Sequence, residues 1–171
     1  QGAAQAVYNG LQEACIFKMD ENLSLLLFST FLGGSDDDSG LSLSFDQVGN
    51  VLVCGGTQST DLTWIGAPYQ SAYAGGNADG WIAKLSPSGS QVLALTYFGT
   101  AAYDQLYFIE TDDQDDVFVY GQTRDATNSL IINAAFSQPN SGMLVTKFNS
   151  TLSGITWSTL FGNGDGKPTL S

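Results

Sequence analysis

Three lysines recur in similar apolar sequence at a nearly constant spacing. Lys18, Lys84 and Lys147 are separated by 66 and 63 residues. Each is followed by a second matched segment ending in glycine, at 30–33, 96–99 and 159–162. A fixed period of this length is typical of stacked copies of one supersecondary unit, because a single copy cannot bury its apolar face alone. The chain is therefore predicted to be a repeat protein.

The matched segments have the patterns of β-strands. Leu41, Leu43 and Phe45 alternate with serines, which is the period of a strand. A β-branched run at 51–54 ends at Gly55-Gly56. No segment shows a sustained helical period with caps, so almost no α-helix is expected. The remaining predicted strands lie at 14–19, 24–32, 81–85, 92–98, 105–111, 117–123, 143–148 and 154–161.

Four short antiparallel strands in each unit, with no helix between them, describe a blade of a β-propeller. We therefore predict an all-β chain with about two and a half blades, a partial propeller. Loops between the second and third strands, at 59–79 and 124–141, are long, and we expect them on the same face as the crossovers between blades. The predicted boundaries are 1–35 for the second half of a blade, 36–99 and 100–162 for complete blades, and 163–171 for the start of the next crossover.

The segments around the strands of the first complete copy form a specific set. They are Ser29-Thr30-Phe31-Leu32-Gly33-Gly34-Ser35 with Asp38, Asp46-Gln47-Val48-Gly49-Asn50-Val51, Pro68-Tyr69-Gln70, and Asp79-Gly80-Trp81-Ile82-Ala83-Lys84-Leu85. This set resembles the SBBP-type β-propeller repeats of large secreted and surface proteins of bacteria. The resemblance implies a propeller scaffold and an extracellular or cell-surface location. The family shares no catalytic residues, so the resemblance implies no enzyme activity.

The composition excludes several classes of function. The chain has 17 acidic and 5 basic residues and a net charge of −12, which would repel a nucleic-acid backbone, so no nucleic-acid partner is expected. It has no apolar run near the ~18 residues that a membrane-spanning helix needs. It also has no histidine, which removes Ser-His-Asp catalysis and histidine-ligated zinc. We predict no enzyme activity and no resident cofactor.

Residues that recur in each copy are expected to serve the scaffold. Each repeat lysine should pack its aliphatic stem and pair with a nearby carboxylate or carbonyl group. Cys15 and Cys54 lie in strand-like segments, and we expect both to be buried thiols. A disulfide between them is the alternative.

The acidic run Asp36, Asp37 and Asp38 lies in one predicted crossover. Asp38 and Asp104 coincide under the 66-residue shift, which favours a structural role as acceptors of turn amides. The alternative is a calcium site at Asp36, Asp37 and Asp38, or at the acidic hairpin 112–116, because oxygen ligands on a loop suit this hard cation.

Residues that do not recur are better candidates for ligand binding. Trp64, Tyr69 and Tyr73 crowd the long loop of the central copy, together with Asp61. Aromatic side chains beside a carboxylate can stack on a sugar or anchor a protein partner. The alternative is that these rings fold the loop onto its own blade.

Two and a half blades cannot close a ring, and open strand edges favour association. The remaining blades, or partner chains, are therefore expected to complete it. The predicted function is a rigid, non-enzymatic scaffold or interaction module of a larger bacterial surface or secreted protein, which binds a protein or glycan through its long-loop face. The alternatives are a carboxylate-dependent glycan hydrolase or lyase on a propeller scaffold and a purely structural, self-assembling segment.

Overall fold

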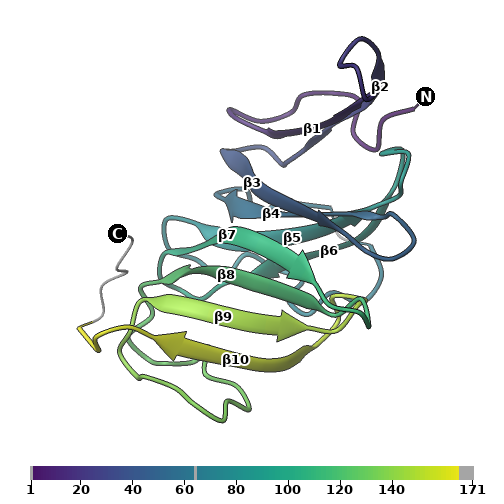
Figure 1. Cartoon of the computed structure of the whole chain (residues 1–171). Helices are drawn as coiled ribbons and strands as arrows, with labels where there is room; N and C mark the ends of the chain where they lie inside the picture. Colours follow the sequence, from purple (N-terminus) through teal and green to yellow (C-terminus); the bar gives the residue numbers. More distant parts are fainter. Residues whose placement is uncertain (1, 64, 166–171) are drawn as a thin grey trace.

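A computed structural model describes residues 2–63 and 65–165, and the regular structure of these residues is entirely β (Figure 1). None of the described residues belongs to a helix that is long and apolar enough to cross a membrane. In chain order the strands are β1 (Ala14–Met19), β2 (Leu26–Leu32), β3 (Asp38–Phe45), β4 (Val51–Thr57), β5 (Asp79–Leu85), β6 (Val92–Phe98), β7 (Asp104–Thr111), β8 (Val117–Thr123), β9 (Met143–Phe148) and β10 (Ile155–Phe161).

The strands form three antiparallel sheets, which we call the first, middle and third sheets. The first sheet contains β1 and β2, the middle sheet has the order β3-β4-β5-β6, and the third has the order β7-β8-β9-β10. Every pair of neighbouring strands within a sheet is antiparallel. The prediction of an all-β chain with antiparallel sheets is thereby confirmed, and the strands lie close to their predicted positions.

One strand end differs from the prediction. Gly55 and Gly56 do not terminate β4, which continues to Thr57 and pairs with the beginning of β3. A Cβ atom on Gly55 would lie only 1.7 Å from the backbone oxygen of Ser39. The glycine therefore allows β3 and β4 to approach closely, and here it belongs to the strand instead of ending it.

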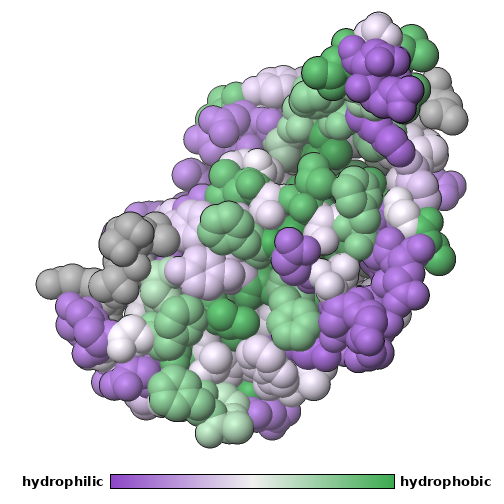
Figure 2. Space-filling view, in the orientation of Figure 1, coloured by the Kyte–Doolittle hydropathy of each residue, from purple (hydrophilic) through white to green (hydrophobic). Residues whose placement is uncertain are grey.

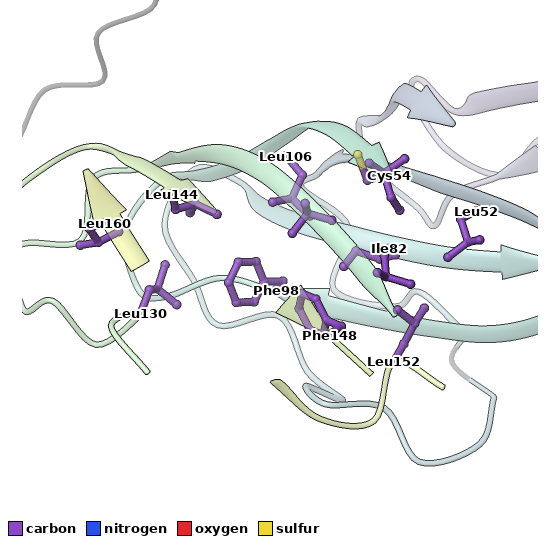
Figure 3. Close-up of a cluster of buried hydrophobic side chains, with 13 residues drawn as sticks. Leu52, Cys54, Ile82, Phe98, Leu106, Leu130, Leu144, Phe148, Leu152 and Leu160 are labelled. Carbon is purple, nitrogen blue, oxygen red and sulfur yellow. The ribbon is translucent and has the colours of Figure 1, made fainter. Parts of the chain in front are cut away.

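The first and third sheets pack on opposite faces of the middle sheet (Figure 1). Side chains of β4 alternate between the two cores, because successive residues of a strand point to opposite faces. Leu52 and Cys54 join the core shared with the third sheet (Figure 3). Val51 and Val53 join the core shared with the first sheet. All seven residues of β4 are consequently buried.

The prediction for the two cysteines is correct for only one of them. Cys54 is buried in the core, whereas Cys15 is exposed, and neither forms a disulfide. Cys15 corresponds to Trp81 of the middle sheet, which is 2% exposed because the first sheet packs over it. No sheet covers the equivalent side of β1 in the described part of the chain.

Two of the three repeat lysines form the expected ion pairs. Lys84 Nζ lies 3.0 Å from Asp46 Oδ2, and Lys147 Nζ lies 2.9 Å from Asp112 Oδ2 and 3.0 Å from Asp116 Oδ2. Both lysines thus bind the turn between the first two strands of their own sheet. Lys18 is exposed and makes no ion pair with a described residue, and the described part of its sheet consists of β1 and β2 alone.

Candidate binding site on the loop face

The connections between sheets and the long loops emerge at one end of the molecule, which we call the loop face. Thr57, the last residue of β4, pairs with Asp38 at the start of β3 and with Asp79 at the start of β5. The crossover 33–37 and the long loop 58–78 therefore leave the middle sheet at the same end. This confirms the prediction that long loops and crossovers share a face.

The same backbone junction joins each pair of adjacent sheets at this face. The N–H of Asp38 donates to the carbonyl of Gln12 over 2.8 Å, and that of Asp104 donates to the carbonyl of Ala78 over 2.9 Å. Each crossover thus adds a short parallel bridge to the segment that precedes β1 or β5. Residues beside these junctions are held by backbone bonds at fixed positions between two sheets.

A polar hollow of about 260 Å³ lies beside these junctions. Gln58 lines it and also lines a second hollow of about 470 Å³, and we call the two together the Gln58 hollow. The first part is lined by Gln12, Asp37, Asp38, Ser39, Gly56, Thr57, Gln58, Ala78, Tyr103 and Gln105. The second part is lined by Asp36, Gln58, Tyr73, Gly76 and Asn77.

Asp38 lines this hollow and is itself buried. Its side-chain Oδ2 accepts hydrogen bonds from the Gly34 N–H at 2.7 Å and the Ser59 hydroxyl at 2.8 Å. Burial raises the pKa of Asp38 above its ordinary value. Asp104 repeats the arrangement, because its Oδ2 accepts the N–H of Thr100 at 2.6 Å. The predicted role of both residues as acceptors of turn amides is thus confirmed.

The three consecutive aspartates do not point to one common centre. Asp36 Oδ1 accepts the N–H of Asp37 at 3.0 Å, whereas Asp38 is directed toward Gly34 and Ser59. Across residues 2–63 and 65–165, no group of three or more Asp, Glu, Cys or His side chains is arranged to hold a metal ion. A calcium site at Asp36, Asp37 and Asp38 therefore stays a prediction without support from the geometry.

The aromatic residues predicted for ligand binding are divided between different environments. Trp64 lies outside the described residues. Tyr69 packs edge-on against Phe148, with ring centroids 5.8 Å apart, and against Phe98 at 6.3 Å. Its N–H also donates to the carbonyl of Leu152. Tyr69 therefore holds the long loop over the junction of the middle and third sheets. The alternative interpretation, that the rings fold the loop onto its own blade, is met only by the contact with Phe98, because Phe148 and Leu152 belong to the next sheet.

Tyr73 and Asp61 reach different hollows of the loop face. The Tyr73 ring lies edge-on to Tyr97 at 6.3 Å, and its hydroxyl donates to the carbonyl of Gly76 at 3.0 Å, which places it in the Gln58 hollow. Asp61 Oδ1 accepts the N–H of Ser35 at 2.9 Å and borders a separate hollow of about 780 Å³. The predicted set thus does not form a single site, and Tyr73 is its member in the Gln58 hollow.

The amide side chains of the hollow were not found from the sequence. Gln12, Gln58 and Gln105 belong to different sheets or loops and follow no motif, although each lies close to a predicted strand end. Two other glutamines, Gln5 and Gln70, do not line the hollow but show that the repeat includes loop residues. They make equivalent bonds, since Gln5 Oε1 accepts the N–H of Gly33 and Gln70 Oε1 accepts that of Gly99. The repeat therefore extends into the loop before β1.

The chemistry of the Gln58 hollow is that of hydrogen bonding to polar ligands. It presents carboxylate oxygens from Asp36 and Asp37 and carboxamides from Gln58 and Asn77. Tyr103 also lines the hollow, and the Arg124 guanidinium lies 5.4 Å from the centroid of its ring. No family model and no curated protein matches the chain.

Proposed function

We propose that this chain is part of an extracellular, non-enzymatic β-propeller of the SBBP type, within a larger bacterial surface or secreted protein, and that its loop face binds a glycan. The observation that carries the proposal is the Gln58 hollow, which is polar, open, and held between two sheets by repeated backbone junctions. Rigid elements hold the ligand-binding groups in place and so lower the entropic cost of binding.

The propeller interpretation is supported by how the complete units pack. Each of the two four-stranded sheets follows the chain order from strand to strand, and β7 of the third sheet packs on β3, β4 and β5 of the middle sheet. Radial repetition of such units is the architecture of a propeller. Remaining blades, from the same protein or from partner chains, would complete the ring.

The lining of the hollow favours a glycan without acidic groups. Sugar hydroxyls donate to the carboxylates of Asp36 and Asp37 and form bonds in both directions with the amides of Gln58 and Asn77. The rings of Tyr73 and Tyr103 offer surfaces for stacking on sugar faces. The net charge of −12 disfavours anionic glycans through electrostatic repulsion.

A glycan array probed with the full chain tests this function. We expect neutral or cationic glycans to be retained. Gln58→Ala and Tyr73→Ala should each weaken binding by about tenfold, the loss of one well-placed contact. Gln114→Ala is the matched control, because Gln114 lies exposed in the hairpin at the opposite end of the sheets. Binding that is unchanged by Gln58→Ala, or a protein ligand on this face instead of a glycan, would contradict the proposal.

A further inference from the structure

A large hollow lies between the first and middle sheets, apart from the Gln58 hollow. It has a volume of about 780 Å³ and we call it the Asp61 hollow. Hydrophobic and hydrophilic side chains both reach the surface of the chain (Figure 2), so hydropathy alone does not single out a ligand site. The equivalent place between the middle and third sheets supplies the comparison. The lining of the Asp61 hollow includes Ala4, Gln5, Leu32, Asp61, Ile65 and Leu95.

The loop before β1 and the long loop of the middle sheet follow equivalent backbone paths, as the bonds of their glutamines show. The residue before each glutamine repeats a further bond. The N–H of Ala4 donates to the carbonyl of Gly89 at 3.0 Å, and the N–H of Tyr69 donates to the carbonyl of Leu152 at 3.0 Å. Gly89 and Leu152 are themselves equivalent, because each holds the left-handed position of its turn. Ala4 therefore occupies the backbone position of Tyr69, and the side chain differs.

The smaller side chain leaves space between the sheets. At the junction of the middle and third sheets, the ring of Tyr69 packs against that of Phe98, with centroids 6.3 Å apart. At the junction of the first and middle sheets, Ala4 stands in place of Tyr69, and Leu32 corresponds to Phe98 under the 66-residue shift. Both Ala4 and Leu32 line the Asp61 hollow. The hollow therefore lies where an aromatic ring of the chain is packed in the next copy.

The long loop of the middle sheet borders the same space from the other side. Ile65 corresponds to Ile131 under the 66-residue shift. Ile131 packs against the core shared by the middle and third sheets, whereas Ile65 is 47% exposed and lines the Asp61 hollow. Each residue in these comparisons has its counterpart in the other junction. The hollow therefore results from the change of side chain and not from the smaller size of the first sheet.

Polar groups line the same hollow and indicate the charge of a ligand. They are the side chains of Gln5, Asn9, Asp61 and Gln91. Asp61 Oδ1 accepts the N–H of Ser35 at 2.9 Å, which holds the carboxylate beside the crossover. An ionised carboxylate can accept several hydrogen bonds, so it can also bind a donor on a ligand. The net charge of −12 favours a cationic donor.

We propose that the Asp61 hollow binds a small aromatic amine. The ring of the ligand takes the place that the Tyr69 ring fills at the next junction, and its ammonium group pairs with Asp61. Pockets for small molecules have volumes of about 300–1,000 Å³ and combine an apolar lining with a few polar groups, and this hollow fits both criteria. It shares no lining residue with the Gln58 hollow, so the inference is independent of glycan binding there.

Titration of the full chain with tyramine, followed by saturation-transfer NMR of the ligand, tests the proposal. We expect saturable binding with a dissociation constant of about 1 mM or lower, as for a good ligand of this size. The probe p-cresol carries the same ring without the amine and should bind about two- to fivefold more weakly. Asp61→Asn keeps an acceptor for Ser35 and should lower the affinity for tyramine to that for p-cresol, which itself should not change.

Filling the hollow should abolish binding. Ala4→Tyr places the ring of the next copy in the hollow and should weaken the binding of both probes by at least about tenfold, because the ring site is then occupied. Ala67→Tyr is the matched control, since it adds the same ring at an exposed position that does not line the hollow. It should leave both affinities unchanged. Asp61→Asn tests the site independently if Ala4→Tyr does not fold.

Trp64→Ala controls for a ring of the chain itself, because Trp64 adjoins the lining residue Ile65 in the sequence. Three results would overturn the proposal: no saturable binding of tyramine, equal tyramine affinities of the wild type and Ala4→Tyr, or binding that appears only in Trp64→Ala. Gln58→Ala should not alter tyramine binding. A negative glycan array with saturable tyramine binding would contradict only the glycan proposal, and the reverse pair of results would contradict only the amine site.

Discussion

Lys84 Nζ lies 3.0 Å from Asp46 Oδ2, and this ion pair ties the third strand of the middle sheet to the turn between its first two strands. The Asp46 side chain is 2% exposed and that of Lys84 is 12% exposed. The same ammonium group donates to the carbonyl of Ser150 in the third sheet at 3.0 Å. One lysine therefore joins three segments from two sheets.

Replacing this lysine should destabilise the fold. Lys84→Met leaves the Asp46 carboxylate buried without its cation, and we expect a loss of about 2–3 kcal/mol in the free energy of unfolding, measured by urea denaturation. Lys18→Met is the matched control and should change stability by less than about 0.5 kcal/mol, because Lys18 is exposed. Equal losses for the two variants would show that the ion pair does not stabilise the fold.

A buried carboxyl group should make stability depend on pH near neutrality. Burial, reinforced by the charge of Asp104, raises the pKa of Asp79 to about 7. Because this pKa lies above the ordinary value of 3.8, the folded state binds a proton more readily than the unfolded state between about pH 4 and pH 7. The contribution of Asp79 to stability is thus fully present below about pH 4 and is lost as the pH rises through 7.

Asp79→Asn isolates this effect. The amide oxygen keeps the acceptor that Asp79 Oδ2 offers to the N–H of Ala74, but the side chain no longer titrates. The difference in unfolding free energy between variant and wild type should therefore shift in favour of the variant as the pH rises from 4 to 8. Urea denaturation at several pH values measures it. A difference that is constant with pH would contradict the assignment of the raised pKa to Asp79.

The strand pattern could be predicted from the sequence because strand periodicity is a local signal. The 66-residue shift then repeats that signal in the next copy. Leu41, Leu43 and Phe45 mark β3 by alternation alone, and the aspartates of the two hairpins mark their turns. Asp46 and Asp112 indeed accept equivalent backbone N–H groups, from Asn50 at 2.8 Å and Asp116 at 2.9 Å.

Exposure and the candidate site could not be predicted in the same way, since both depend on which neighbours are present. Cys15 and Leu43 have the sequence pattern of core residues, yet no sheet covers them in the described part of the chain. The Gln58 hollow combines residues from separate loops and sheets. Its members become neighbours only through the packing of adjacent sheets, which no single segment specifies.

Two adjacent glycines of β4 should differ sharply in their tolerance of a side chain. A Cβ on Gly55 would lie 1.7 Å from the backbone oxygen of Ser39, whereas one on Gly56 would first meet the Gln105 side chain at 3.2 Å. The backbone of Ser39 cannot move away without disturbing the pairing of β3 and β4, whereas the long side chain of Gln105 can change its rotamer. Gly55→Ala should therefore cost on the order of 3 kcal/mol of unfolding free energy, and Gly56→Ala about 1 kcal/mol or less. Thermal and urea denaturation of both variants test this, and a larger cost for Gly56→Ala would show that β3 and β4 are less closely apposed.

Equivalent turns between the third and fourth strands place different residues in the same left-handed conformation. Leu23 has a φ of 55°, Gly89 of 66° and Leu152 of 59°. In each turn this residue donates its N–H to the carbonyl three positions earlier. The turn thus requires a positive φ, which glycine adopts without steric cost and leucine does not.

The two leucines should respond in opposite directions to glycine. Leu23 is 76% exposed, so Leu23→Gly relieves backbone strain without loss of packing and should stabilise the protein by about 0.5–1 kcal/mol. Leu152 is fully buried in the core shared by the middle and third sheets, so Leu152→Gly should destabilise it by about 2–4 kcal/mol. Urea denaturation of both variants measures these effects. A stabilising Leu152→Gly would show that strain at this position outweighs its contribution to the core, and a destabilising Leu23→Gly would show that the exposed leucine makes contacts that the strain relief does not offset.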